Sequence, residues 1–305
     1  MYNIKNHMQC GCGYDNGQNV VKTGLKSCCS DLSNKVVVIT GAGGVLCGVF
    51  AKECAKYGAK VALLDINLES AQKYADEIIA SGGSAKVYKA DVLDKDALEK
   101  VRLQVGKDLG KCNILINGAG GNSTKATTDK EYYSDGDIGS VKTFFDLDKS
   151  GFSFVFDLNI MGTIIPSQVF VKDMLGGRKG CSILNISSMN AFTPLTKIPA
   201  YSAAKSGVSN FTQWLAVHFA KEGIRSNAIA PGFFVTNQNA ALLYDKDGKP
   251  TPRAGKIISA TPMGRFGKDE ELLGALMFLI DETKSGFVNG VILPIDGGFN
   301  AYSGV

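Results

Sequence analysis

The sequence predicts an α/β protein: a single domain with a doubly wound parallel sheet of seven strands and helices on both faces. Seven short apolar runs rich in Val and Ile recur along the chain, and stretches of helical length separate them. Strand followed by helix, repeated, gives parallel strands with right-handed crossovers. The strands are expected at 35–40, 60–65, 85–90, 113–117, 181–187, 226–230 and 291–295.

Length and composition set the domain organisation. Doubly wound domains of roughly 250 residues fold as one unit, and this chain has 305 residues, 45% hydrophobic and 20% charged. We expect a flexible N-terminal extension at 1–31 and one domain at 32–305. Two longer connections within it, 121–148 and 233–262, are expected to form substrate loops at the ligand-binding edge, the second as a lid.

Charge and hydropathy exclude two classes of partner. The net charge is only +4, and no run of Lys and Arg would follow a phosphate backbone, which argues against nucleic acid. The N-terminus lacks the apolar segment of a signal peptide, and the most apolar later stretch, 272–280, is too short to cross a bilayer. We therefore expect a cytoplasmic protein without membrane contact.

The eight cysteines fall into two groups of four. Those within apolar strand or helix patterns are interpreted as reduced, buried thiols: Cys47, Cys54, Cys112 and Cys181. The others crowd into the extension: Cys10, Cys12, Cys28 and Cys29. Thiolates favour zinc, but the spacing fits no standard finger, so the prediction is that the protein holds no metal.

A glycine-rich turn follows the first strand and points to dinucleotide binding. Backbone N–H groups of such a turn approach a pyrophosphate, and the helix expected from Val45 favours its negative charge. The second strand ends at Asp65, whose carboxylate could accept hydrogen bonds from the adenosine ribose and would repel the 2′-phosphate of NADP, so NAD is favoured. The alternative is that Asp65 only caps the helix from Ile66. Residues of this site are Thr40, Gly41, Gly43, Gly44, Val45, Leu46 and Asp65, with Asp91 and Val92 beside the adenine.

The catalytic candidates are Ser188, Tyr201 and Lys205. Tyr201 and Lys205 are four residues apart in an expected helix, so they share one face. A phenol is a poor base at neutral pH, and the Lys205 ammonium is expected to lower the pKa of Tyr201. Ser188, delivered to the carboxyl edge by the fifth strand, would hydrogen-bond the substrate oxygen.

These motifs together resemble the short-chain dehydrogenase/reductase family from about Leu32 to the C-terminus. The matching features are Thr40-Gly41 with its glycine turn, Asn117-Gly118-Ala119-Gly120, Asn159, Ser188, Tyr201-x-x-x-Lys205, and Pro231-Gly232 with Thr236. The chain departs from the family at Val45 and Cys47, where the usual turn has its later glycines.

The resemblance implies a Rossmann fold, a homotetramer and a role for each matching residue. Asn117 would steady the central strand, Gly118, Ala119 and Gly120 would line the cofactor cleft, and Asn159 would hold a water in a proton relay to Lys205. Four residues would flank the nicotinamide, beside Tyr201 and Lys205: Pro231, Gly232, Phe234 and Thr236.

Within the family, the chain is most similar to the D-mannonate oxidoreductases, also called fructuronate reductases. The cues are the stretches 43–47, 120–122, 125–128, 188–192, 194–199 and the ending 301–305. A sugar-acid substrate needs a cation and several hydrogen-bonding groups. Candidates are Asn122, Lys125, Asn190, Lys197 and Gln238, with Asn239 and Arg253 as further ones. Alternatives are a gluconate 5-dehydrogenase-like, polyol or 3-oxoacyl reductase, or a dinucleotide-sensing protein without turnover.

Overall fold

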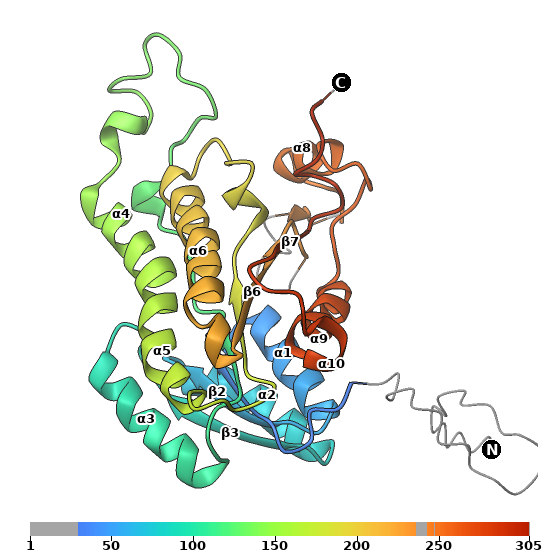
Figure 1. Cartoon of the computed structure of the whole chain (residues 1–305). Helices are drawn as coiled ribbons and strands as arrows, with labels where there is room; N and C mark the ends of the chain where they lie inside the picture. The colour runs from blue at the N-terminus through green and yellow to red at the C-terminus, as the bar shows by residue number, and fades with distance from the viewer. Residues whose placement is uncertain (1–29, 236–242, 247, 305) are drawn as a thin grey trace, which may run out of the picture.

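The computed structural model describes residues 30–235, 243–246 and 248–304, which form one doubly wound domain (Figure 1). Its seven strands are all parallel and lie in the order β3-β2-β1-β4-β5-β6-β7. They are β1 (Val36–Thr40), β2 (Lys60–Asp65), β3 (Ser84–Lys89), β4 (Ile114–Asn117), β5 (Ser182–Ile186), β6 (Arg225–Pro231) and β7 (Ile292–Ile295). The predicted fold class is confirmed.

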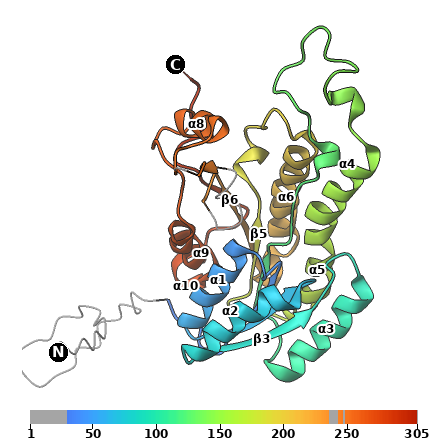
Figure 2. The ribbon, with the colours of Figure 1, turned by 180° about the vertical axis from the view of Figure 1, so that it is seen from behind.

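Helices cover both faces of the sheet (Figures 1 and 2). They are α1 (Val45–Lys56), α2 (Leu68–Ala80), α3 (Lys95–Asp108), α4 (Lys149–Phe156), α5 (Gly162–Phe170), α6 (Pro199–His218), α8 (Pro252–Ser259), α9 (Leu273–Ile280) and α10 (Glu282–Ser285). One buried apolar cluster joins α1, α2 and α9 to the sheet. A second cluster, on alternate residues of the same strands, joins α3, α5 and α6 to the other face.

The strand order reverses between β1 and β4, which are neighbours although three helices and two strands separate them in the chain. The carboxyl ends of the strands on either side of this point diverge and leave a crevice where ligands of such sheets bind. The fold therefore places the turn after β1 and the residues after β4 and β5 at one edge.

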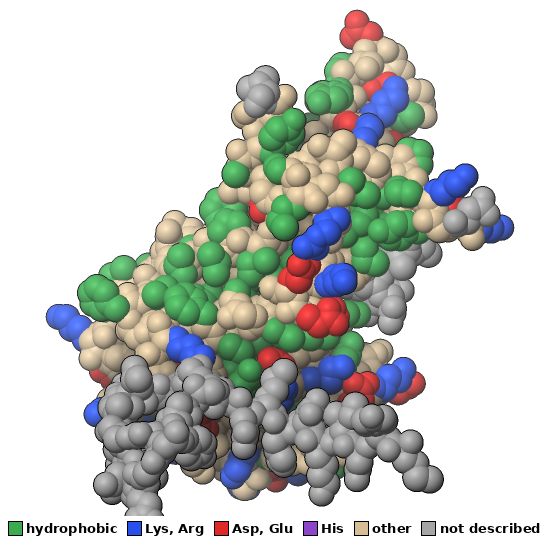
Figure 3. Space-filling model, turned by 90° about the vertical axis from the view of Figure 1, so that its right-hand side faces the viewer, with side chains coloured by type: hydrophobic (Ala, Val, Ile, Leu, Met, Phe, Trp, Pro, Cys, Tyr) green, Lys and Arg blue, Asp and Glu red, His purple; other side chains and the backbone are tan. Residues whose placement is uncertain are grey.

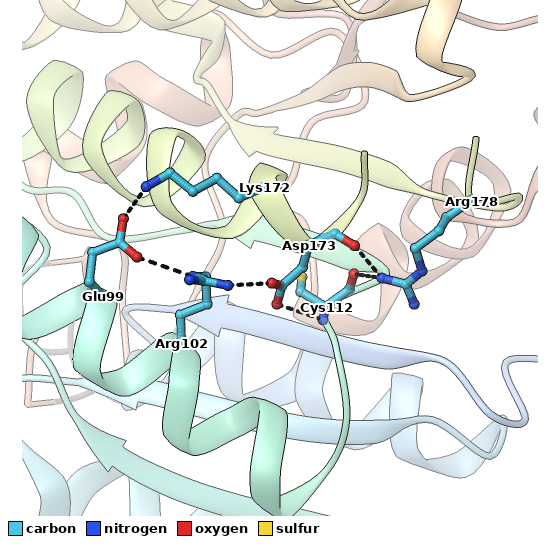
Figure 4. A network of polar contacts seen from close by, with 6 residues as sticks. All are labelled: Glu99, Arg102, Cys112, Lys172, Asp173 and Arg178. Carbon is cyan, nitrogen blue, oxygen red and sulfur yellow. Dashed lines mark hydrogen bonds and ion pairs between the residues drawn. The ribbon is translucent and has the colours of Figure 1, made fainter. Parts of the chain in front are cut away.

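A polar network ties the opposite, amino edge of the sheet together (Figure 4). The buried Asp173 carboxylate accepts from Arg102 Nη1 of α3 at 2.6 Å and from the Cys112 backbone N–H at 3.2 Å. Arg178 Nη1 donates to the Cys112 carbonyl oxygen at 2.9 Å and also to that of Asp173. The network fixes the start of β4 against α3 and is far from the ligand-binding edge.

The segment 121–148 is a hydrogen-bonded lobe that projects from the carboxyl edge, and α8 stands across from it (Figure 1). Within the lobe, the Asp129 N–H donates a hydrogen bond to the Lys142 carbonyl oxygen at 2.9 Å. The buried Asp137 carboxylate forms an ion pair with Lys130 Nζ at 2.5 Å. In 233–262, a hydrogen bond from the Asp245 N–H to the Lys249 carbonyl oxygen, at 2.8 Å, closes the expected turn. Residues 236–242 and 247 of the second loop lie outside the described residues.

One helical stretch, Lys149–Asp173, is long and apolar enough to cross a membrane by length and composition alone. It is longer than 272–280, which the sequence had marked as the most apolar stretch. Half of its apolar window is buried inside the protein, and α5 within it packs on the sheet and on α3. A core helix of a soluble protein meets the same criteria, so the stretch is weak evidence for a membrane span.

The cysteines of the domain are buried and free, as predicted: Cys47, Cys54, Cys112 and Cys181. Burial raises the pKa of the Cys47 and Cys54 thiols to about 12, so both stay protonated and unreactive at neutral pH. The four cysteines of the extension lie outside the described residues. At the expected start of the domain, Ser30 and Leu32 are buried, at 8% and 2% exposed.

Candidate functional site

The glycine-rich turn after β1 leads into a helix, α1, whose first turn has no side-chain cap. Gly44 is the N-cap of α1 in an extended conformation, with no side-chain cap and no acidic residue in the first turn. Gly41 has φ +65°, and a Cβ there would lie 2.8 Å from the Ala119 Cα. Only glycine fits at Gly41, and the uncapped N–H groups of α1 fit the pyrophosphate of a dinucleotide.

Asp65 is held at the end of β2 by two backbone donors. Its Oδ2 accepts from the Gly43 N–H and its Oδ1 from the Asn67 N–H, both at 2.8 Å. The helix α2 begins at Leu68 with Asn67 as its N-cap, so the alternative that Asp65 caps a helix from Ile66 is wrong. The carboxylate is half-buried and fixed beside the glycine turn, where the ribose of a dinucleotide would lie.

A buried hydrogen-bond chain positions the residues after β4. Thr40 Oγ1 accepts from the N–H groups of Gly118 at 3.1 Å and Ala119 at 3.3 Å. Asn117 Nδ2 donates to Asn185 Oδ1 of β5 at 2.8 Å and to Ser167 Oγ of α5 at 3.0 Å. Asn117 therefore links β4 to β5 and α5, as the family resemblance implied.

Asn159 lies in a π-helical turn, Asp157–Met161, between α4 and α5. Its Nδ2 donates to the carbonyl oxygens of Gly121 at 2.7 Å and Val155 at 2.8 Å. A Cβ on Gly120 would lie 2.7 Å from Asn159 Oδ1 and 3.2 Å from Lys205 Nζ. Asn159 and Lys205 thus meet at one point, and only glycine leaves space between them. Wide turns of this kind often mark functional sites.

Ser188, Tyr201 and Lys205 come together at the carboxyl edge. Ser188 follows β5 and caps a short 3-10 turn, with its Oγ accepting from the Asn190 N–H at 3.2 Å. Pro199 starts α6, which places Tyr201 and Lys205 one turn apart on the same face. Lys205 Nζ lies 5.7 Å from the centre of the Tyr201 ring and donates to the Ile186 carbonyl oxygen at 2.8 Å.

Burial controls the protonation of both side chains on α6. It raises the pKa of the Tyr201 phenol, and a hydrogen bond with the Ser188 side chain opposes that rise. It lowers the pKa of Lys205 to about 8. The expectation that Lys205 lowers the pKa of Tyr201 is wrong for this structure, because the ammonium is directed at the Ile186 carbonyl and desolvation of the phenol dominates.

The remaining cofactor candidates lie around this edge. Gly232 donates its N–H to the Ile295 carbonyl at 2.9 Å, which sets Pro231–Gly232 beside the end of β7. Phe234 is 7% exposed and packs its ring on Gly267. Val92 is buried against Gly162, whereas Asp91 is exposed. Thr236 lies outside the described residues.

Four of the substrate candidates lie on segments that border Tyr201. Asn190, 5% exposed, has no hydrogen-bond partner on its Oδ1 within the described part of the chain. Lys197 is half-buried, and its carbonyl accepts from the Thr128 N–H at 3.0 Å. Asn122 and Lys125 are exposed at the base of the lobe. Arg253 is exposed on α8, and Gln238 and Asn239 lie outside the described residues.

A cavity of about 90 Å³ in the described part of the chain shares no residue with the catalytic group. Its walls come from the segments after β6 and β7: Phe233, Phe234, Thr261, Met263, Arg265 and Asp296. It is too small for a sugar acid with its cofactor. The reacting position is therefore assigned from Ser188, Tyr201 and Lys205.

Two contacts at this edge were missed by the sequence reasoning. Lys256 Nζ of α8 forms an ion pair with Glu131 Oε1 of the lobe at 2.9 Å, across 125 positions. Thr193 Oγ1 donates to Asn300 Oδ1 near the C-terminus at 3.1 Å. Neither pair has a sequence signal, because each depends on the paths of two irregular segments.

The glycine turn and the Ser188–Tyr201 pair face the same crevice, so a dinucleotide bound on α1 would reach Tyr201 with its nicotinamide end. This is the arrangement of a dehydrogenase. The pattern of short chain dehydrogenases matches residues 35–247. An uncharacterised oxidoreductase of Haemophilus influenzae is 64% identical over 275 residues, which is 90% of this chain and 96% of that protein.

A second relative, the uncharacterised oxidoreductase UxuB of Bacillus subtilis, is 51% identical over 90% of this chain and 98% of its own length. A crystal structure with bound NAD, of a Haemophilus influenzae protein described as a candidate D-mannonate oxidoreductase, is 64% identical. It superposes with a TM-score of 0.88 over 90% of this chain and 98% of its own. This chain belongs to the short-chain dehydrogenase family and is an oxidoreductase.

Proposed function

We propose that this chain is an NAD-dependent reductase of a hydroxylated sugar acid that interconverts D-fructuronate and D-mannonate. The observation that carries the proposal is the meeting of Ser188, Tyr201, Lys205 and Asn159 at the carboxyl edge of the sheet. The similarity to the NAD-bound Haemophilus protein, at 64% identity, supports the sugar acid and the cofactor. The same fold without this group would bind a dinucleotide without turning it over.

In the proposed reaction Tyr201 moves the proton. NADH supplies the hydride to the carbonyl carbon. Because burial raises the pKa of Tyr201, its hydroxyl stays protonated at neutral pH and donates to the substrate oxygen. Ser188 hydrogen-bonds that oxygen, and Asn159 holds a water through which the proton is replenished from Lys205. In the reverse direction Tyr201 must first lose its proton, so kcat/KM for oxidation rises with pH.

The choice of NAD rests on Asp65. Its carboxylate is held by the N–H groups of Gly43 and Asn67 and cannot turn away from a ligand without losing both bonds. A 2′-phosphate at the ribose would meet this negative charge at close range. The backbone donors of the glycine turn, the Pro231–Gly232 edge and the residues after β4 complete the cofactor site.

Recognition of the sugar acid is assigned to residues around Tyr201. Lys197 and Lys125 supply positive charge for the carboxylate, and Asn190 and Asn122 supply hydrogen bonds for the hydroxyls. The orphaned Asn190 Oδ1, next to Ser188, is an acceptor with no partner among the described residues, and leaving it unpaired is costly. A substrate hydroxyl would satisfy it once the site closes around the ligand.

The protein is also proposed to be a cytoplasmic homotetramer. The adjacent helices α4 and α6 expose a row of apolar side chains: Phe154, Phe156, Trp214 and Val217. On another side, the face with α9 and α10 carries a band of hydrophobic side chains (Figure 3), and Phe287 there is fully exposed. Two separate isologous faces are what a tetramer with two-fold axes requires.

The test is NADH oxidation by the purified full chain with D-fructuronate, beside 5-ketogluconate, an acetoacetyl thioester and NADPH. Rapid, selective oxidation with D-fructuronate supports both the substrate and the cofactor. Turnover of 5-ketogluconate in its place keeps the mechanism and replaces the substrate. No turnover of any carbonyl contradicts the proposed enzyme and favours a binding role.

A further inference from the structure

Three separate segments meet near the start of α6, the helix that carries Tyr201. They are the lobe at 121–148, the segment 192–198 that leads into α6, and α8. The Thr128 N–H bonds the Lys197 carbonyl at 3.0 Å, which holds the lobe against the second segment. The pair of Glu131 and Lys256 at 2.9 Å joins the lobe to α8. The lobe and α8 stand on opposite sides of the edge in both views (Figures 1 and 2).

At this junction the Glu131 carboxylate lies in the field of two ammonium groups. Lys256 is its direct partner, and both Lys256 and Lys197 lower the pKa of Glu131. Among the described residues, no ion pair within 4.0 Å involves the Lys197 ammonium, which acts on Glu131 from a longer distance. The Glu131 carboxylate is therefore paired with one cation and lies in the field of a second.

The position of Lys197 relates this junction to the reacting carbon. Lys197 lies two residues before α6, and Tyr201 is in the first turn of that helix. Ser188 lies at the start of the connection from β5 to α6, so this connection borders the reacting position at both ends. A six-carbon acid with its carbonyl at Tyr201 has a carboxylate a few bonds away.

We propose that Glu131 is an internal stand-in for the carboxylate of the substrate: it pairs with Lys256 in the field of Lys197 in the free enzyme, and the substrate carboxylate replaces it. This inference rests on the proposed function and specifies its substrate class as a carboxylate. The neutral polyol of the same carbon skeleton lacks the group that displaces Glu131. Glu131 therefore lowers the affinity of the site for a carboxylate, and a neutral sugar does not compete with it.

The exposure of the pair makes the exchange feasible. The side chains of Lys256 and Glu131 are 69% and 37% exposed. Exposed ion pairs contribute at most about 1 kcal/mol, a factor of about five in an equilibrium constant, so a ligand that adds hydroxyl contacts can displace Glu131. Removing Glu131 should therefore tighten the binding of a carboxylate by about two- to five-fold.

The experiment is calorimetric titration of D-mannonate into the full-length protein saturated with NADH, in parallel with D-mannitol, which has CH2OH in place of the carboxylate. The variants are Glu131→Gln, Lys197→Met, Lys256→Met and the double variant of Glu131→Gln with Lys256→Met. The matched control is Glu77→Gln, because Glu77 forms an exposed ion pair with Lys52 at the same 2.9 Å between α1 and α2.

The expected result is a Kd for D-mannonate that falls two- to five-fold in Glu131→Gln and rises in both lysine variants. The gain from Glu131→Gln shrinks when Lys256 is already Met, and neither Glu77→Gln nor any D-mannitol titration changes. A weaker or unchanged Kd in Glu131→Gln overturns the inference, as does an equal effect on D-mannitol. Absence of D-mannonate binding in every variant overturns it too, and NADH oxidation with D-fructuronate then judges the proposed function separately.

Discussion

Tyr201 and Lys205 show how much of this chemistry is decided by a single residue's surroundings. The spacing of four residues correctly placed both on one face of α6. The spacing does not reveal desolvation, which raises the pKa of Tyr201 and lowers that of Lys205 to about 8. Electrostatic roles depend on where each atom points in three dimensions, so they could not be predicted from sequence alone.

Replacing Tyr201 by Phe removes the proton donor and little else. We expect Tyr201→Phe to fold, to bind NADH with near-normal affinity and to lose at least about 10²- to 10⁴-fold in kcat, the range attributed to general acid catalysis. Stopped-flow NADH oxidation and NADH fluorescence titration measure the two effects. Tyr57→Phe, at the C-cap of α1, is the control; near-normal turnover of Tyr201→Phe would show that another group donates the proton.

The charged form of Lys205 lowers the free energy of unfolding, because its ammonium group is buried. Its pKa falls from 10.5 to about 8 on folding, so below pH 8 the folded state bears the full penalty, about 3 kcal/mol, and the penalty disappears as pH rises to 10.5. Loss of its hydrogen bond to Ile186 offsets about 1 kcal/mol. We expect Lys205→Met to be inactive yet about 2 kcal/mol more stable at pH 7 in denaturant unfolding. An advantage that stays constant to pH 10.5 would contradict this reasoning.

Replacing Asp65 by Asn removes the negative charge of this side chain and leaves its shape nearly the same. In Asp65→Asn the amide oxygen can keep the hydrogen bond from the Gly43 or Asn67 N–H, but the repulsion of a 2′-phosphate is lost. We expect the preference for NADH over NADPH in kcat/KM to fall by about tenfold, equivalent to about 1.4 kcal/mol. If the preference is unchanged, it is set by the shape of the pocket and not by the carboxylate.

At the scale of elements, the strands were the most predictable part of the molecule. Each lies within a residue or so of its expected range, because strands buried on both faces read as continuous apolar runs. The π-turn at Asn159 was not foreseen, since one extra residue in a helical turn leaves no mark on apolar periodicity. The ion pair of Glu131 with Lys256 was missed for the same kind of reason: lobe and α8 follow no repeating pattern.

The network at the amino edge stabilises the fold without taking part in the chemistry (Figure 4). Asp173 is 5% exposed and is bonded to Arg102 and Cys112. We expect Asp173→Asn to lower the free energy of unfolding by about 2 kcal/mol, because it weakens a buried charge-assisted hydrogen bond and leaves Arg102 paired only with Glu99, with KM unchanged. Glu99→Gln, at the more exposed end, should cost less than about 1 kcal/mol. Equal losses for the two variants would mean that burial is not the deciding factor.

At the scale of the whole molecule, the exposed apolar faces support the proposed homotetramer. We expect light scattering to give a mass near four times the 32.3 kDa of one chain. Val217→Glu on α6, where Val217 is 80% exposed, should shift the mass toward the dimer or monomer without unfolding the chain. Leu103→Glu, at a 57% exposed site on α3, is the control. A monomeric wild-type protein would remove the tetramer from the proposed function.

The lobe at 121–148 enters and leaves the domain at one edge of the sheet, and its internal hydrogen bonds are satisfied within the segment itself. Part of the proposed substrate recognition is thereby separated from hydride transfer: the strands and α6 hold the reacting groups, and a contiguous insert carries Glu131 and Lys125, while Asn190 and Lys197 lie on the connection between β5 and α6. Exchanging the part of the gene that encodes this segment would change the substrate preference of a related dehydrogenase. The catalytic residues on the strands and α6 would stay the same.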